Sequence, residues 1–187
     1  MPAETPTLAA SATPVATPLP AGACLEPPDD YTRVTVRGET VSARTLWMVE
    51  RAKELYTGPA DMMRVTQGSY RTDVGASFGT HAGGGAVDIS IRDPKTNEFL
   101  YGETEAMVHA LRLAGFAAWY RPADALGKGS PPHIHAIAVG DKELSPDAQA
   151  QLTGDEGYFR GMDGLPPPNG PHPDPYGGPI VCKWMKP

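Results

Sequence analysis

Two segments of the chain carry the side-chain types that bind divalent metal ions. The first spans residues 65–91 and reads VTQGSYRTDVGASFGTHAGGGAVDISI, and the second spans residues 131–140 and reads PPHIHAIAVG. Four of their side chains offer nitrogen or oxygen donors to a metal: His81, Asp88, His133 and His135. Two imidazoles and a carboxylate suit Zn²⁺, and three protein ligands leave a fourth position for water, which is typical of a catalytic zinc site.

The spacing within each segment favours convergence of these side chains. Residues 86–91 (AVDISI) have the composition of a β-strand, so the aspartate of this segment should lie on a strand. The three glycines at 83–85 allow the chain to fold back and bring His81 toward that strand. His133 and His135 are two residues apart, so on a strand both side chains point to the same face of the sheet.

At these residues the sequence resembles the D-Ala-D-Ala metallopeptidases. Residues 81–88 (HAGGGAVD) fit that family's pattern H-x-x-G-x-A-x-D, and the family belongs with lysostaphin-type endopeptidases and the hedgehog signalling domain to one zinc-binding superfamily. Residues 69–71 (SYR) are similar to the family's S-x-Y-R or G-Y-R segment, whose arginine is assigned to transition-state stabilisation. Residues 133–135 (HIH) are similar to the H-x-H of lysostaphin-type enzymes, whose second histidine binds zinc. The resemblance covers residues 67–140.

The resemblance implies a set of site residues and an activity. Zinc would be bound by His81, Asp88 and His135, and His133 is the alternative third ligand if the chain follows the P-W-H pattern of D,D-carboxypeptidases. Otherwise His133 would be the general base, and Arg71 would stabilise the oxyanion or pair with a substrate carboxylate. The substrate would be a peptidoglycan peptide or another small peptide, cut by a D-Ala-D-Ala carboxypeptidase or endopeptidase.

The sequence departs from the family pattern at the catalytic glutamate. Many D-Ala-D-Ala peptidases carry E-x-x-H, whereas here Pro132 stands three residues before His135 and Ser130 three residues before His133. Neither side chain accepts a proton as a carboxylate does. The alternative to an enzyme that uses His133 as its base is therefore a catalytically weak zinc domain that binds cell-wall peptides or a protein partner. A structural domain without metal is the third interpretation.

The composition indicates one domain and excludes some partners. The chain has 187 residues, of which 40% are hydrophobic, enough for a single core. Its net charge of −6 argues against nucleic acid or an anionic membrane surface as the main partner. No apolar run is long enough for a transmembrane helix, and we expect a monomer.

The prolines and cysteines predict the organisation of the chain and its compartment. We expect an Ala/Thr/Pro-rich tether at 1–28, a zinc peptidase-like domain at 29–152 and a Pro/Gly-rich tail at 153–187 that packs on the domain. A disulfide between the two cysteines, Cys24 and Cys182, would tie the start of the domain to its end. This pairing predicts an extracellular or cell-envelope protein, and two free thiols in a cytoplasmic protein are the alternative.

The hydrophobic pattern predicts an α+β domain with a small, mainly antiparallel sheet and packed helices. The resemblance implies the zinc fold of hedgehog and the D-Ala-D-Ala peptidases. The expected strands span residues 31–36, 63–69, 86–91, 116–120 and 133–139, and the last of these should be central because both of its faces are apolar. The expected helices begin after caps at Ser42 and Thr104, and a further short helix should span residues 146–152. Asp73 or Asp124 could hydrogen-bond a ligand histidine.

Overall fold

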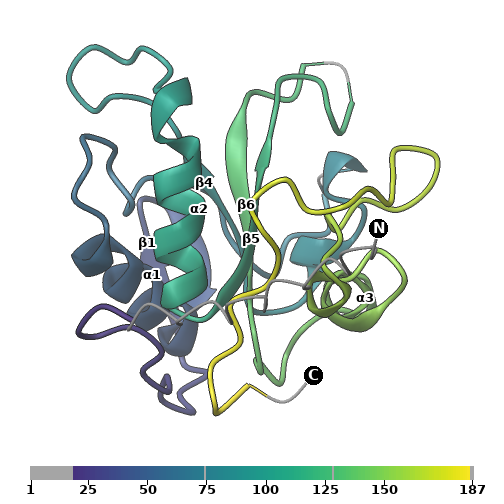
Figure 1. The fold of residues 1–187 in the computed structure, drawn as a ribbon, viewed down its shortest axis with the longest axis horizontal. Coiled ribbons are helices and arrows are strands. Elements are labelled where there is room, and N and C mark those ends of the chain that lie inside the picture. The colour runs from purple at the N-terminus through teal and green to yellow at the C-terminus, as the bar shows by residue number, and fades with distance from the viewer. Residues whose placement is uncertain (1–18, 74, 128, 186–187) are drawn as a thin grey trace, which may run out of the picture.

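The computed structural model describes residues 19–73, 75–127 and 129–185, and in this part of the chain it shows an α+β fold with two antiparallel sheets and three α-helices (Figure 1). The strands are β1 (Arg33–Val36), β2 (Glu39–Ser42), β3 (Val65–Gln67), β4 (Ala86–Ser90), β5 (Phe116–Arg121) and β6 (His133–Ala138). The helices are α1 (Ala43–Leu55), α2 (Thr104–Leu113) and α3 (Pro146–Thr153). The predicted fold class is confirmed at this level, and the more specific zinc-peptidase fold stays a prediction.

The main sheet has four strands in the order β3-β4-β6-β5, and every neighbouring pair is antiparallel. Strand β6 therefore has a partner on each side, and all of its residues are buried. Its sequence HIHAIA carries apolar side chains on both faces, so the prediction that this strand is central is confirmed.

Strands β1 and β2 form a separate hairpin, which the sequence predicted only in part. Residues 37–40 (RGET) have the composition of a turn, but the structure confines the turn to Arg37 and Gly38, and β2 begins at Glu39. Both turn residues have positive φ, 52° and 88°, as the tight two-residue turn of a hairpin requires. The polar residues after the turn are extended because they pair with β1, which their own composition does not reveal.

One of the two predicted helix caps is confirmed. The Ser42 side chain accepts a hydrogen bond from the Thr45 backbone at 3.1 Å, and Ser145 caps α3 in the same way. The prediction that Thr104 caps α2 is wrong, because Thr104 is the first helical residue and its hydroxyl donates to the Tyr101 carbonyl at 3.0 Å. A 3₁₀ turn, η3 (Tyr101–Glu103), runs directly into α2, so this helix start has no separate capping residue.

The two faces of the main sheet have different surroundings. Helices α1 and α2 lie against one face, and α3 lies on the other side of the strands (Figure 1). The face toward α1 and α2 is apolar in its central strands: Val87, Ile89, Ile134 and Ala136. The opposite face is apolar only at one end, where Ala86, Ala117 and Ile137 pack with α3 and the C-terminal segment. Its other end carries polar side chains.

Both ends of the described chain are attached to this domain. Although residues 19–28 fall within the predicted tether, the Cys24 backbone donates to the Leu113 carbonyl at 2.8 Å. In the C-terminal segment, the Asp174 carboxylate forms an ion pair with the buried Arg112 of α2 at 2.8 Å. The predicted disulfide between Cys24 and Cys182 is present and closes a loop of 158 residues. Residues 1–18 of the predicted tether lie outside the described residues. None of the described helices is both long and apolar enough to cross a membrane.

The disulfide should make a large contribution to stability. A cross-link across 158 residues removes much of the conformational freedom of the unfolded chain, which corresponds to about 4 to 5 kcal/mol in the chain-entropy description. We expect the double variant Cys24→Ser/Cys182→Ser to lose roughly 3–5 kcal/mol of unfolding free energy in urea titrations. Reduced and alkylated wild-type protein should unfold at the same urea concentration as the variant. An unchanged midpoint would contradict this expectation.

Candidate metal centre

A cleft of about 500 Å³ opens on the polar end of the sheet face that lies away from α1 and α2. Its walls come from strands β3 to β6, from the turns η1 (Gly75–Ser77) and η2 (Thr80–Ala82), and from loop residues on both sides of position 128. All four predicted donor residues line it: His81, Asp88, His133 and His135. The two distant segments of the sequence therefore meet in one cavity.

Strand register places most of these side chains. His135 on the central strand β6 pairs with Asp88 on β4 and, on the other side, with Trp119 on β5. The neighbouring row across the same three strands consists of Ser90, His133 and Arg121. Paired residues of antiparallel strands share a face, as do residues two apart on one strand. The cleft is consequently lined by five residues of these rows: Asp88, Ser90, Arg121, His133 and His135.

The glycine run positions His81 beside these strands. His81 lies in turn η2, and its carbonyl accepts a hydrogen bond from the Arg71 backbone at 2.7 Å. The chain then passes close to the loop before α3, where a Cβ added at Gly83 would lie 2.3 Å from the Glu143 carbonyl oxygen. Gly85 has a φ of +78°, which side chains strongly disfavour. Only glycine meets both requirements, so the run permits the close return of His81 toward β4.

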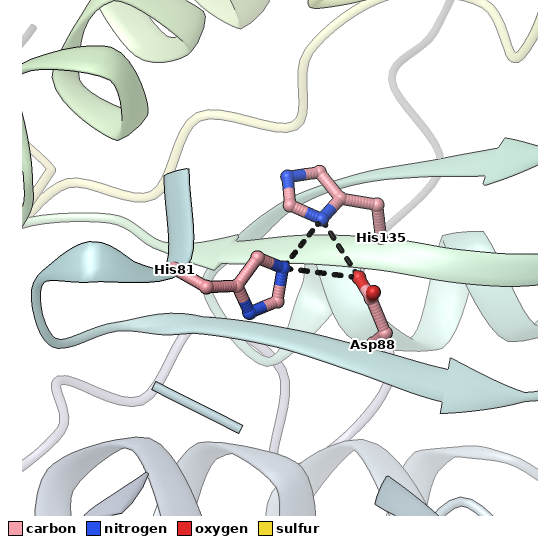
Figure 2. A group of neighbouring side chains, drawn as sticks. All are labelled: His81, Asp88 and His135. Carbon is pink, nitrogen blue, oxygen red and sulfur yellow. Dashed lines mark hydrogen bonds and ion pairs between the residues drawn. The ribbon is translucent and has the colours of Figure 1, made fainter. Parts of the chain in front are cut away.

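Three donor atoms converge, as Figure 2 shows, and their residues all line the cleft. His81 Nε2 lies 3.3 Å from Asp88 Oδ1 and 3.3 Å from His135 Nδ1, and the last two atoms are 2.8 Å apart. Tetrahedral Zn²⁺ with bonds of about 2.0–2.1 Å holds its donors roughly 3.3 Å from one another. Two of the three separations match this value, and the third requires only a small spreading of the pair. The cluster therefore has the donor types and the spacing to hold a metal ion.

The hydrogen bonds around the two rings leave the correct nitrogen of each available. His81 Nδ1 lies 2.7 Å from the Gly68 carbonyl oxygen, which can only accept, so this nitrogen carries the hydrogen and Nε2 has the free lone pair. His135 Nε2 lies 3.1 Å from Gln151 Oε1, which assigns its hydrogen to Nε2 and leaves Nδ1 free. Such outer partners fix the orientation of metal-binding histidines. Both free nitrogens point at Asp88.

Burial and mutual interaction set the charges in this cluster. Burial acts to raise the pKa of Asp88, but the adjacent His81 and His135 outweigh it and hold the pKa far below its usual range. Burial lowers the pKa of His135 to about 4, against the opposing effect of Asp88. Burial also acts to lower the pKa of His81, but the Asp88 carboxylate dominates and raises it. At neutral pH the cluster thus offers an ionised carboxylate and a neutral His135, the forms that bind metals.

His133 lies beside the three-donor cluster rather than in it. Its Nδ1 donates to the Pro131 carbonyl at 2.8 Å, so Nε2 carries the free lone pair. Nε2 is buried, lies 3.7 Å from Asp88 Oδ2 and has no hydrogen-bond partner among the described residues. Of the two candidates for the third ligand, the geometry therefore puts His135 in the cluster and leaves His133 with an available basic nitrogen next to it.

Arg71 does not line the cleft. Its guanidinium forms a two-pronged pair with Asp73, at 2.7 and 2.9 Å, and a further contact with Glu39 at 3.2 Å. The side chain is 37% exposed. The catalytic role that the resemblance implies for Arg71 therefore stays a prediction, and in this arrangement its hydrogen-bonding capacity is already engaged by acidic neighbours.

Sequence reasoning missed two residues of the site, Arg121 and Gln151, and misjudged the possible outer partners. Arg121 is 3% exposed and lines the cleft, although the predicted strand ended one residue before it. The sequence feature that could have identified Arg121 is its position directly after the apolar run FAAWY. Gln151 had no distinguishing signal in the polar helix PDAQAQLT. Neither Asp73 nor Asp124 bonds a ligand histidine, because Asp73 pairs with Arg71 and Asp124 accepts from a backbone amide of its own loop.

Comparison with protein families, with curated proteins and with solved structures found no match for this chain. A functional assignment therefore depends on the residues of the cleft and on their geometry.

The three-donor cluster predicts stoichiometric metal binding. We expect one Zn²⁺ per chain by elemental analysis after dialysis. His81→Ala, Asp88→Ala and His135→Ala should each lose the metal, because each removes one of three ligands. The matched control is His109→Ala, which removes an exposed histidine of α2 on the opposite side of the sheet. Zinc retained at full occupancy by all three cluster variants would contradict the assignment.

Gln151 should support metal binding through His135. Gln151→Leu removes the acceptor for His135 Nε2–H, so the ring loses the bond that fixes its orientation. We expect zinc affinity to fall by about 10–100-fold in competition titrations with a chelator. Gln149→Leu makes the same change at an exposed position of the same helix and should bind zinc like the wild type. Equal affinities for the two variants would disprove the role of Gln151.

Proposed function

We propose that this chain is a zinc-dependent peptidase that hydrolyses peptide bonds in peptidoglycan peptides, as a D-Ala-D-Ala carboxypeptidase or endopeptidase. The observation that carries the proposal is the convergence of His81, Asp88 and His135 in a cleft, with the free nitrogen of His133 next to them. The resemblance of the same residues to the H-x-x-G-x-A-x-D and H-x-H motifs supports the substrate class. A volume of about 500 Å³ is in the range that accommodates a short peptide.

His81, Asp88 and His135 would hold the zinc ion. When bound there, zinc supplies a Lewis acid that polarises a carbonyl group and makes water more acidic. The protein contributes the orientation of the ligands: Gly68 and Gln151 hold the two rings, and strand pairing holds Asp88 opposite His135. Because these supports are backbone and side-chain groups of rigid elements, the geometry is prepared before a substrate arrives.

His133 is the proposed general base. Its Nδ1–H bond to Pro131 fixes the ring and leaves Nε2 to take a proton from the attacking water. The imidazolium formed would lie 3.7 Å from Asp88 Oδ2, so a buried negative charge stabilises it. The same nitrogen can then return the proton to the leaving amine. This assignment replaces the glutamate of the E-x-x-H pattern, which the chain lacks.

One observation favours the alternative of a catalytically weak binding module. Among the described residues that line the cleft, Asp88 is the one carboxylate, and the metal cluster already uses it. Catalysis therefore depends on His133 alone as the base. A binding module would retain the metal and recognise cell-wall peptides or a protein partner without turnover.

The disulfide supports a location outside the cytoplasm. Disulfides persist in oxidising compartments, and the Cys24–Cys182 bond joins both ends of the domain. A peptidoglycan substrate would be met in the same compartment. We therefore propose an extracellular or cell-envelope location.

The two candidate functions differ in the effect of replacing His133. Zinc-loaded wild-type protein should release fragments from purified muropeptides, detected by mass spectrometry. His133→Ala should keep one zinc per chain but lose about 10²–10⁴-fold in kcat, because only the proton transfer is removed. His109→Ala serves as the control with full activity. A zinc-loaded wild-type protein that binds muropeptides and releases nothing would support the binding module and refute the peptidase.

A further inference from the structure

Arg121 is a buried cation in the wall of the cleft. It ends strand β5, directly opposite His133 on β6 and in the row next to the metal cluster. The guanidinium carbon lies 5.3 Å from the centre of the Trp119 ring, and Trp119 stacks on His135 at 6.4 Å. The arginine is therefore held by packing close to the side chains that would do the chemistry.

The carboxylates of Asp163, Asp88 and Asp174 lie near enough to favour the charge of Arg121, but two nitrogens of its guanidinium lack hydrogen-bond partners in the described part of the chain. Its Nε and Nη2 are covered by protein atoms and have no hydrogen-bond partner among the described residues. Burial lowers the pKa of Arg121 to about 10, so the group stays charged at neutral pH. A buried charge without acceptors is costly and is retained in proteins mostly where a ligand or a reaction uses it. Arg112, the other deeply buried arginine of this region, bonds to carbonyls and a carboxylate.

The cleft as a whole is positively charged in an acidic protein. Three arginines line it, Arg64, Arg92 and Arg121, against the single carboxylate of Asp88. Arg64 and Arg92 are partly exposed, and each donates to Asn97. A bound divalent metal would add to the positive charge. With a net charge of −6 on the whole chain, this local excess favours an anionic ligand at this position.

We propose that Arg121 is the anion-binding residue of the cleft and pairs with a carboxylate that the peptide ligand carries next to the bond to be cut. Nε and Nη2 form one edge of the guanidinium, with N–H bonds that match both oxygens of a carboxylate. This edge fits a carboxylate better than an oxyanion, which presents a single oxygen. Pairing requires the guanidinium to turn toward the cleft that its side chain already lines.

The inference assigns to Arg121 a task that Arg71 is poorly placed to perform. Arg71 lies outside the cleft and is paired with Asp73 and Glu39, whereas Arg121 lines the cleft with an unpaired edge. The identity of the ligand as a peptide rests on the proposed function. The preference for a carboxylate at Arg121 does not, because it follows from the charge and the unpaired nitrogens.

The test compares two ligands that differ only in this group, N-acetyl-D-alanyl-D-alanine and its C-terminal amide. Binding to the zinc-loaded His133→Ala protein is measured by calorimetry, so that turnover does not interfere. We expect the acid to bind at least about 10-fold more tightly than the amide. When Arg121→Gln is added to the His133→Ala protein, the difference in affinity should disappear, because only the binding of the acid becomes weaker. Arg121→Lys should retain part of the difference. Arg160→Gln makes the same charge change at an exposed site and should leave the difference intact.

A second measurement needs no variant at position 121. In the zinc-loaded wild-type protein, the Arg121 Nε–H proton signal should move downfield with the acid and not with the amide. The assignment is overturned if the acid and the amide bind equally or if neither binds. It is also overturned if Arg121→Gln weakens the binding of both ligands to the same extent, because that result is expected if Arg121 stabilises an oxyanion or only packs against its neighbours. Discrimination without any hydrolysis of muropeptides would refute the peptidase and keep the role of Arg121. Hydrolysis of muropeptides together with equal binding of the acid and the amide would keep the peptidase and refute the role of Arg121.

Discussion

The site depends on the pairing of β4 with β6. This register sets Asp88 directly opposite His135 and, one row further, Ser90 opposite His133. Side chains alternate between faces along a strand, so a slip of one residue would turn Asp88 into the apolar core against α1 and α2. The hydrophobic residues on the other face, Val87 and Ile89 among them, prevent such a slip because they would lose their burial. The core therefore specifies the position of the candidate metal-binding side chains.

The cleft concentrates polar groups that the protein itself does not fully satisfy. Next to the cluster lie His133 Nε2 and two nitrogens of Arg121, all buried and without hydrogen-bond partners among the described residues. Elsewhere, Arg112 bonds to the Ala118 and Gly178 carbonyls, and Arg44 bonds to the carbonyl of Val139, although Arg44 Nε, Arg51 Nε and Asp174 Oδ2 are also buried without a hydrogen-bond partner among the described residues. Three of the six buried side-chain atoms that have no hydrogen-bond partner among the described residues therefore lie on two neighbouring residues of this cavity, where a ligand would supply their partners.

The scaffold around the cleft is held from several directions. Strand β6 is paired on both sides, helix α3 brings Gln151 to His135, and the loop before α3 packs on the glycine run that carries His81. The disulfide closes the domain by joining Cys24 to Cys182. Because each donor residue is supported by a different element, the metal cluster reports on the integrity of the whole fold.

The amino-acid sequence by itself determined the four candidate donor residues His81, Asp88, His133 and His135, the α+β class and the cysteine pair, because chemical type, period-two spacing and composition are local properties. It left open which of His133 and His135 joins the other two donors. It could not determine which arginine reaches the cleft. Arg71 stood beside the motif but pairs with Asp73 and Glu39, while Arg121 and Gln151 arrive from β5 and α3. Only the tertiary structure decided their positions, since strand order and helix packing bring together residues whose separation along the chain carries no information about contact.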